Sequence, residues 1–112
     1  DHTSADPLAR RALRVAMGTA FTLPHARTWS LTDDLRAIAA DVELYALTPD
    51  PGAQDIHTVR PSGRRAIVVG SERAGISDEV LSFARPVRIP MAGGVDSLNA
   101  AAALAIACYA LG

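Results

Sequence analysis

The sequence predicts an α/β fold with a mainly parallel sheet flanked by helices. Residues 65–70 form a continuous apolar run that ends in glycine, which is typical of a strand buried on both faces. Residues 42–47 predict another strand, and segments with helical periodicity lie before, between and after these runs. Because strands and helices alternate along the chain, the strands are expected to pair in parallel.

The size and composition of the chain predict one domain, residues 1–112, with one hydrophobic core. Hydrophobic residues make up 49% of the chain, charged residues 21%, and the net charge is −1. The chain therefore has no overall basic field to attract nucleic acid, although a local contact is not excluded. The single cysteine, Cys108, excludes a disulfide within the chain and fits a reducing cytoplasm. The longest apolar run, residues 100–111, is too short to cross a bilayer, so no membrane partner is expected.

The first two helices are predicted from their start signals and apolar stripes. Asp6 followed by proline is typical of a helix cap, and the periodic segment after it covers residues 8–21. The next helix is expected at residues 31–40, with Ser30 or Thr32 as its cap.

The middle of the chain carries the strands. After the strand at 42–47, residues 50–64 are expected to form a loop with at most one turn of helix. The buried strand at 65–70 follows, and Ser77 is placed to cap a third helix that begins with two acidic residues. A short strand is expected at 87–89.

The most apolar helix is predicted at the end of the chain. Asp96 or Ser97 is expected to cap it, and it runs to about Leu111, with Gly112 in the position of a C-cap glycine. The pair Gly93-Gly94 precedes this helix. The free N–H groups of a helix N-terminus behind a glycine loop suit a carboxylate or a phosphate.

Three loops are candidates for a ligand site. In an open α/β sheet, ligands bind outside the carboxyl ends of the strands, and residues 47–49, 70–75 and 90–99 follow predicted strands. Two interpretations stay open from composition alone: a ligand pocket, or ordinary connecting loops in which Ser97 is only a cap. Glu72 directly follows a buried strand, so it is expected to need a partner, which would be an arginine, backbone N–H groups or a substrate.

Other residue clusters are less specific. The histidines are scattered without a second ligand at helical spacing, so no metal site is expected: His2, His25 and His57. A small basic face is predicted on the first helix, and it is either a solvated surface or an RNA contact: Arg10, Arg11 and Arg14.

Two blocks give the sequence a family resemblance. Residues 66–77 (AIVVGSERAGIS) and 88–99 (RIPMAGGVDSLN), the latter followed by an alanine-rich helix, resemble the second and third motifs of the SpoU (TrmH-like) branch of the SPOUT RNA methyltransferases. Residues 11–24 are similar to the middle helix of that family. The order and spacing of these segments agree with the family, and the resemblance covers nearly the whole chain.

The resemblance implies a fold, a cofactor and a reaction. The fold would be the family's α/β domain with a C-terminal trefoil knot, and the protein would pair as a homodimer. The cofactor would be S-adenosylmethionine, and its methyl group would go to a ribose 2′-hydroxyl of tRNA or rRNA. The implied cofactor-binding residues are Leu47, Gly70, Ile89, Met91, Ser97 and Leu98. The implied catalytic residues are Glu72, which helps to order the site, and Ser97 and Asn99, which face the reactive end of the cofactor.

The sequence also departs from the family pattern. The first motif of the family, an Asn…Arg block, is absent, and Asn99 is the only asparagine in the chain. We therefore expect the chain to be the C-terminal part of the catalytic domain, without the N-terminal strand-helix-strand, and to be inactive alone. A non-catalytic module that binds S-adenosylmethionine or RNA is the main alternative. A domain that binds another nucleotide at the same strand ends is a third interpretation.

Overall fold

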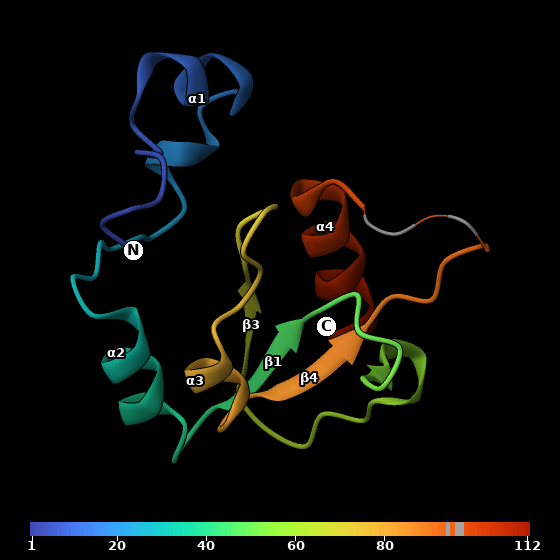
Figure 1. The fold of residues 1–112 in the computed structure, drawn as a ribbon. Helices are drawn as coiled ribbons and strands as arrows, with labels where there is room; N and C mark the ends of the chain where they lie inside the picture. Colours follow the sequence, from blue (N-terminus) through green and yellow to red (C-terminus); the bar gives the residue numbers. More distant parts are fainter. Residues whose placement is uncertain (94, 96–97) are drawn as a thin grey trace. The chain divides into compact units, whose positions relative to one another are not determined.

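The computed structural model of the chain describes residues 1–93, 95 and 98–112 (Figure 1). Contacts within the chain group it into two compact units, Asp1–Asp34 and Leu35–Gly112. The single domain over residues 1–112 stays a prediction. The elements are α1 (Arg10–Val15), η1 (Thr19–Phe21), α2 (Leu31–Ile38), β1 (Glu43–Leu47), β2 (Gln54–Asp55), η2 (Ile56–Thr58), β3 (Arg65–Val69), α3 (Asp78–Leu81), β4 (Arg85–Arg88) and α4 (Ala100–Leu111).

The first predicted helix, residues 8–21, is broken into α1 and η1. Met17 and Gly18 both have left-handed backbone angles, with φ of 49° and 82°, and a helix cannot continue through them. Asp6 is not the cap of α1, because the N-cap is Ala9; its carboxylate instead accepts a hydrogen bond from the backbone N–H of Leu8. No residue of α1 or η1 is buried.

The second unit is built on a four-stranded sheet in the order β2-β4-β1-β3, and its three strand pairs are parallel. The predicted α/β class is therefore confirmed. Leu47, the last residue of β1, pairs with Val69 on one side and Val87 on the other. Because parallel strands run in the same direction, the segments that follow β1, β3 and β4 all leave the sheet at the carboxyl ends of the strands (Figure 1). The segment expected to be a loop contributes the two-residue strand β2 and the short helix η2.

The expectation that residues 65–70 are buried on both faces is wrong. β3 is the edge strand of the described sheet and pairs only with β1. Val68 is buried, whereas Val69 is 36% exposed. The apolar run identified the strand correctly. It could not show that only one side of this strand would pair with another strand of the described sheet.

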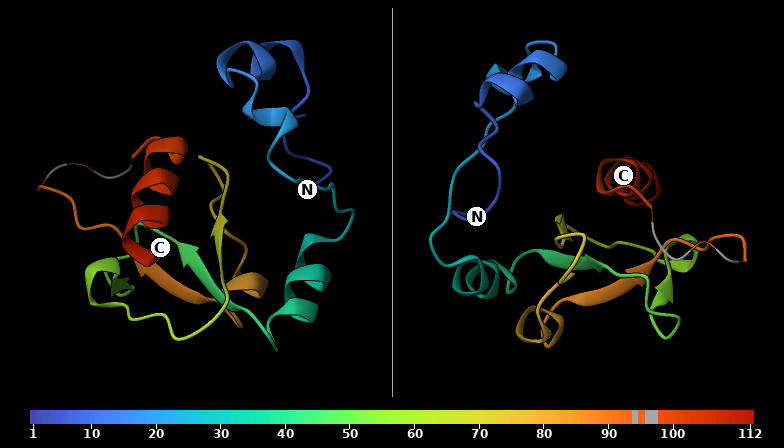
Figure 2. Two further views of the ribbon diagram at one scale, coloured as in Figure 1. Left: turned by 180° about the vertical axis from the view of Figure 1, so that it is seen from behind. Right: turned by 45° about the horizontal axis from the view of Figure 1, so that its top comes forward.

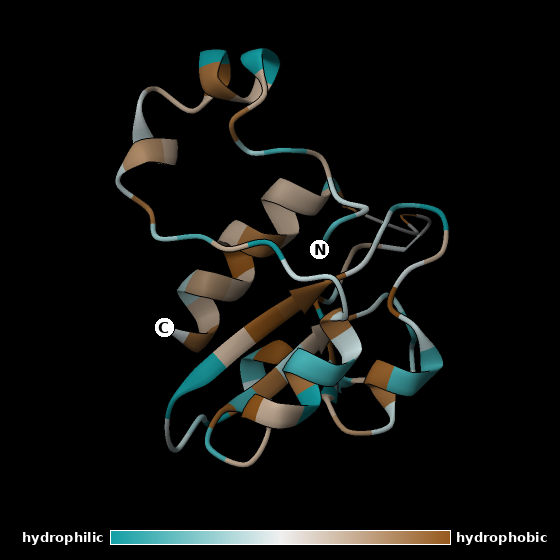
Figure 3. Cartoon of the chain, turned by 90° about the vertical axis from the view of Figure 1, so that its left-hand side faces the viewer, coloured by the Kyte–Doolittle hydropathy of each residue, from teal (hydrophilic) through white to brown (hydrophobic). Residues whose placement is uncertain are grey.

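The core lies between the sheet and α4. Its fully buried members are Tyr45, Ile56, Val59, Val87, Ala107 and Leu111. In Figure 2, α4 covers one face of the sheet and α3 lies toward the other. Figure 3 shows that α4 is apolar along almost its whole length, but only Ala107 and Leu111 of this helix are buried. Much of the apolar surface of α4 therefore remains exposed.

A hydrogen-bonded group holds the opposite edge of the sheet, where the strands begin. The Glu43 carboxylate accepts hydrogen bonds from the hydroxyl groups of Ser62, at 2.5 Å, and Tyr45, at 2.7 Å. These bonds favour the charged carboxylate, so they lower the pKa of Glu43. Burial, followed by the contact with Glu43, raises the pKa of Tyr45. The group ties the loop before β3 to the start of β1.

The loop between β3 and α3 is closed by its own backbone. The Gly75 N–H donates to the Ser71 carbonyl at 2.9 Å, and the Ala74 N–H donates to the Ser71 hydroxyl at 3.1 Å. Gly75 has a φ of 67°, in the left-handed region that favours glycine. A Cβ atom on Gly70 would lie 2.2 Å from the carbonyl carbon of Gly75. Ser77 then caps α3 by accepting from the Val80 N–H, as predicted.

We expect Gly70→Ala to lower the free energy of unfolding by about 2 kcal/mol or more, because the new Cβ would collide with backbone that cannot swing aside as a side chain could. Gly63→Ala is the matched control, since no atom lies within 4 Å of the place that its Cβ would occupy, and a change within about 0.5 kcal/mol is expected. Urea denaturation measures both. Equal stability of the two variants would contradict the tight closure of this loop.

Candidate functional site

A cavity of about 400 Å³ lies at the edge of the sheet where β1, β3 and β4 end. All three loops that the sequence predicted contribute to it. The cavity is lined by Leu47, Thr48, Pro49, residues 69–76, Leu81, Val87, Ile89, Met91, Leu98, Ala100 and Ala103. Segments that are far apart in the sequence therefore line one cavity, and the binding of a ligand in it stays a prediction.

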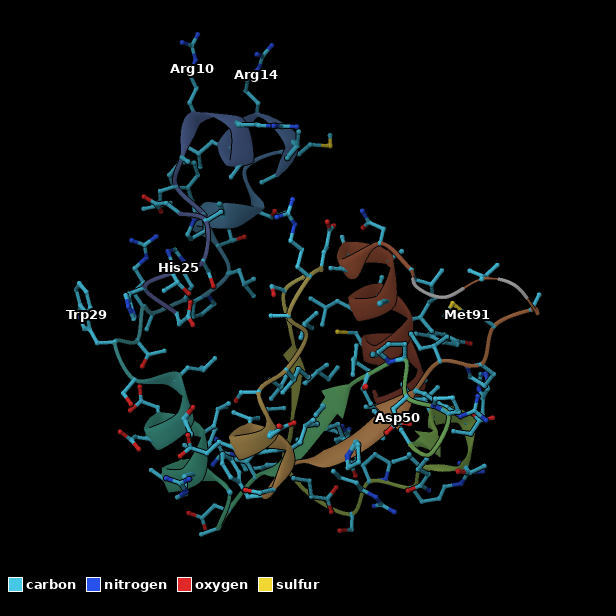
Figure 4. All side chains as sticks on the ribbon, in the orientation of Figure 1. Arg10, Arg14, His25, Trp29, Asp50 and Met91 are labelled. Atoms are coloured by element: carbon cyan, nitrogen blue, oxygen red, sulfur yellow. The ribbon has the colours of Figure 1, made fainter. Side chains whose placement is uncertain are left out.

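Most of the predicted cofactor-binding residues line this cavity. They are Leu47, Gly70, Ile89, Met91 and Leu98. Met91 lies on the segment that leaves β4 (Figure 4). The sixth residue, Ser97, is outside the described residues. Gly70 also has a structural role that the sequence did not reveal. Its backbone lies so close to Gly75 that a side chain at position 70 would not fit within the loop.

The cavity walls are mainly apolar. Leu47 and Val87, which pair across β1 and β4, contribute from the sheet, and Val87 is completely buried. Ala100 and Ala103 contribute from α4 at i,i+3 spacing, which places both side chains on one face of the helix. Small side chains there leave room between helix and sheet. Such walls suit the flat face of an aromatic ring.

Four polar residues lie around the cavity: Thr48, Ser71, Glu72 and Arg73. Two of them are engaged by their own loops, because the Thr48 hydroxyl accepts from the Asp50 N–H and the Ser71 hydroxyl accepts from the Ala74 N–H. Glu72 is exposed, so its charge does not require an arginine or backbone N–H groups as a partner, and the substrate among the expected partners stays a prediction. A carboxylate at an exposed loop tip is hydrated, and it remains available to a ligand.

Asn99 has a structural task that the sequence analysis missed. It is the N-cap of α4, and its side-chain oxygen accepts from the N–H groups of Ala101, at 2.9 Å, and Ala102, at 3.4 Å. The expectation that Asp96 or Ser97 caps this helix is therefore wrong. The Asn99 side chain is not among the described groups that line the cavity. Because the side-chain oxygen is used by the cap, only the amide NH₂ group of Asn99 is left to donate a hydrogen bond to a ligand. Gly112 is the C-cap, as predicted.

The predicted basic face lies in the first unit. Arg10, Arg11 and Arg14 are all exposed, and Arg10 and Arg14 project from the same side of α1 (Figure 4). Their contact with RNA stays a prediction.

Neither a metal cluster nor a membrane helix is found in the described part of the chain. No group of three or more His, Cys, Asp or Glu side chains in that part could hold a metal ion. None of its helices has the length and apolar character that spanning a bilayer requires.

Several cavity residues were given no role by sequence reasoning. Thr48, Ser71 and Arg73 lie within the candidate loops, whereas Val87, Ala100 and Ala103 lie outside them. The signal for Ser71 and Arg73 was present, because both lie in the glycine loop that was singled out. Nothing in the local pattern could show which alanines of α4 face the sheet, since the helix is apolar on every side.

The fold and the sequence of the chain match those of a known protein family. Residues 1–109 match the SpoU rRNA Methylase family, so the chain belongs to this family. The predicted resemblance is thereby confirmed.

Three similar proteins illustrate the relationship. The uncharacterized tRNA/rRNA methyltransferase Rv0881 of Mycobacterium tuberculosis is 40% identical over 94% of this chain and 38% of its own length. The 23S rRNA (guanosine-2′-O-)-methyltransferase RlmB of Vibrio cholerae is 31% identical over 92% of this chain and 42% of its own length. The crystal structure of an AdoMet-bound rRNA methyltransferase from Sinorhizobium meliloti aligns with a TM-score of 0.84 at 34% identity, and covers 95% of this chain and 41% of that one. The chain thus spans about two fifths of the length of these relatives.

We expect Asn99→Ala to lower the free energy of unfolding by about 1 kcal/mol, because the first turn of α4 would lose the oxygen that accepts from Ala101 and Ala102. Asn99→Asp is the matched control: aspartate caps about as well as asparagine, so its stability should stay close to wild type. Chemical denaturation followed by circular dichroism measures both variants. An Asp variant that loses as much stability as the Ala variant would argue against the capping role.

Proposed function

We propose that the cavity binds S-adenosylmethionine and that the protein transfers its methyl group to a ribose 2′-hydroxyl of tRNA or rRNA. The observation that carries the proposal is the meeting of Leu47, Gly70, Ile89, Met91 and Leu98 at one cavity. These residues come from separate segments of the chain, and the sequence motifs alone had assigned all five to the cofactor. The AdoMet bound in the Sinorhizobium meliloti structure supports the cofactor, and the name of the Vibrio cholerae relative supports the 2′-hydroxyl.

The residues of the cavity fit this cofactor. A volume of about 400 Å³ falls within the range of ordinary small-molecule pockets. The apolar walls from Leu47, Ile89 and Ala103 suit an adenine ring, and the hydroxyl groups of Thr48 and Ser71 suit a ribose. The cavity therefore offers an apolar part and a polar rim, as a nucleoside requires.

The chemistry assigns a task to each part of the site. S-adenosylmethionine supplies a methyl group that its sulfonium makes electrophilic. The cavity walls bind the nucleoside and keep water from the reacting atoms. Glu72 places a negative charge at the rim, which favours a positively charged ligand. Asn99 and Ser97 are proposed to orient the reacting groups, since methyl transfer in line with the attacking hydroxyl depends on alignment.

The remaining implications of the resemblance are proposals as well. The homodimer is supported by the exposed apolar surface of α4, where Leu104 and Ile106 are partly exposed and Tyr109 is 91% exposed. The RNA contact of Arg10, Arg11 and Arg14 is supported by their exposure and their shared helix. The proposed C-terminal knot rests on the family resemblance. The proposed cytoplasmic location rests on the single thiol, Cys108, which fits a reducing compartment.

The binding of cofactor is tested by filling the cavity from α4. We expect the wild-type chain to bind S-adenosylhomocysteine, the demethylated cofactor, in a calorimetric titration. Ala103→Leu should weaken this binding at least tenfold, because three added carbon atoms would occupy the space between helix and sheet. Ala105→Leu adds the same atoms to an exposed position of the same helix and should bind like wild type.

Three outcomes of this titration would contradict the proposed cavity. They are tight binding by Ala103→Leu, equal weakening in both leucine variants, and the absence of binding in a folded wild-type chain. Asn99→Asp adds a further test, since it keeps the cap of α4 and removes the amide NH₂ group. A folded Asn99→Asp variant with weakened binding would support the proposed orienting role of Asn99.

The second candidate function is a module that binds cofactor or RNA without catalysis. The absent Asn…Arg block of the first motif favours it for this chain taken alone. We expect the chain to bind S-adenosylhomocysteine but to transfer no labelled methyl group from S-adenosylmethionine to bulk tRNA or rRNA. Incorporation of label into RNA by the chain alone would show that the first motif is not needed, and mapping the labelled nucleotide would identify the accepting hydroxyl.

A further inference from the structure

We propose that Arg73 binds a backbone phosphate of the RNA substrate at the mouth of the cavity. This inference rests on the proposed function and names the side chain that would hold the substrate beside the cofactor. Arg73 lines the cavity together with Glu72, and it is the only cationic side chain among the described residues that do so.

Arg73 lies on a loop that is closed by its own hydrogen bonds. Ser71 closes the loop through its carbonyl and its hydroxyl, and the close approach of Gly70 and Gly75 leaves the backbone little room to move. Glu72 and Arg73 therefore occupy the tip of a turn whose base is bonded to itself. The closed backbone fixes where the Arg73 side chain begins, so a ligand does not have to order the loop before it meets this side chain.

The guanidinium group of Arg73 is available for a ligand. Within the part of the chain that the structure describes, no hydrogen bond or ion pair engages it, although the neighbouring residue is the carboxylate Glu72. Arg73 is exposed, so its charge needs no partner from the protein. An arginine that faces water at the mouth of a cavity is suited to an anion that arrives from solution.

The chemistry of the proposed substrate supplies such an anion next to the reacting atom. In RNA, the carbon that bears the 2′-hydroxyl is bonded to the carbon whose oxygen carries the 3′-phosphate. Any hydroxyl presented to a methyl donor in the cavity therefore brings a phosphate to the mouth of the same cavity. The planar guanidinium can bind two phosphate oxygens at once, which would orient the ribose as well as attract it.

One other anion must be distinguished from phosphate, namely the carboxylate of the cofactor itself. The two assignments predict different measurements. A phosphate contact changes RNA binding and its salt dependence, because each phosphate that is neutralised releases counterions. A contact with the cofactor carboxylate changes the affinity for S-adenosylhomocysteine, which keeps that carboxylate.

The test uses three variants of the chain. Arg73→Gln removes the charge, and Arg73→Lys keeps the charge but loses the two-pronged geometry. Arg64→Gln is the matched control, because Arg64 is exposed, precedes β3 at the opposite edge of the sheet, and its replacement changes the net charge equally. The probe is a short fluorescein-labelled single-stranded RNA of mixed sequence, titrated by anisotropy from about 50 to about 200 mM salt. S-adenosylhomocysteine is titrated separately by calorimetry.

We expect Arg73→Gln to weaken RNA binding several-fold and to lower the slope of log affinity against log salt by about 0.7, the contribution of one phosphate contact to a single strand. Arg73→Lys should keep the slope and bind RNA with intermediate affinity. Arg64→Gln should match wild type, and all variants should bind S-adenosylhomocysteine equally.

Other results would overturn the assignment. Weaker binding of S-adenosylhomocysteine to Arg73→Gln, with an unchanged salt slope for RNA, would assign Arg73 to the cofactor carboxylate. Equal losses in Arg73→Gln and Arg64→Gln would show an effect of net charge alone. A wild-type chain that binds S-adenosylhomocysteine but not RNA would overturn the proposed RNA contact together with this inference. Wild-type RNA binding that Arg73→Gln leaves unchanged would overturn the role of Arg73 alone.

Discussion

The parallel pairing of β1 with β3 on one side and β4 on the other is the interaction on which the rest of the structure depends. β1 is an interior strand, and its residues Leu44, Tyr45 and Ala46 are buried. Pairing in parallel makes the segments after the three strands leave the sheet at a common edge, and this places loops from residues 47–49, 70–76 and 89–91 around one cavity. An antiparallel partner on either side would send one of these loops to the other end of the sheet.

The second contribution comes from α4, which packs on the sheet and completes the cavity with alanine side chains. Its buried residues Ala107 and Leu111 lie near its end, and its first turn faces the cavity with Ala100 and Ala103. The cap at Asn99 therefore determines where the helical part of the cavity wall begins. The same residue belongs to the motif that resembles the family's third block, so the proposed orienting role would share one side chain with the cap. This overlap is the reason why truncation to alanine cannot separate the two tasks, whereas aspartate can.

The loop after β3 combines tight backbone closure with charged side chains. Gly70 and Gly75 allow backbone atoms to approach where any Cβ would intervene, and Ser71 saturates the hydrogen-bonding groups at the base of the turn. This arrangement requires small side chains at fixed positions. It displays Glu72 and Arg73 at the cavity without needing partners from the protein. A carboxylate and a guanidinium side by side can serve a ligand pair of opposite charges, as a sulfonium cofactor and an RNA backbone would be.

The sequence by itself determined the fold class, the strands β1, β3 and β4 to within about two residues, and six residues of the cavity, Glu72 included. It did so because apolar runs, turn residues and two extended motifs are local signals, and because parallel strands must bring their carboxyl ends together. Tertiary structure alone decided that β3 stands at the edge of the described sheet and that Asn99, not Asp96 or Ser97, caps α4. It also decided which alanines of α4 face the sheet. These features depend on which elements pack beside each strand or helix. A run of apolar residues looks the same in the sequence whether or not another element covers it.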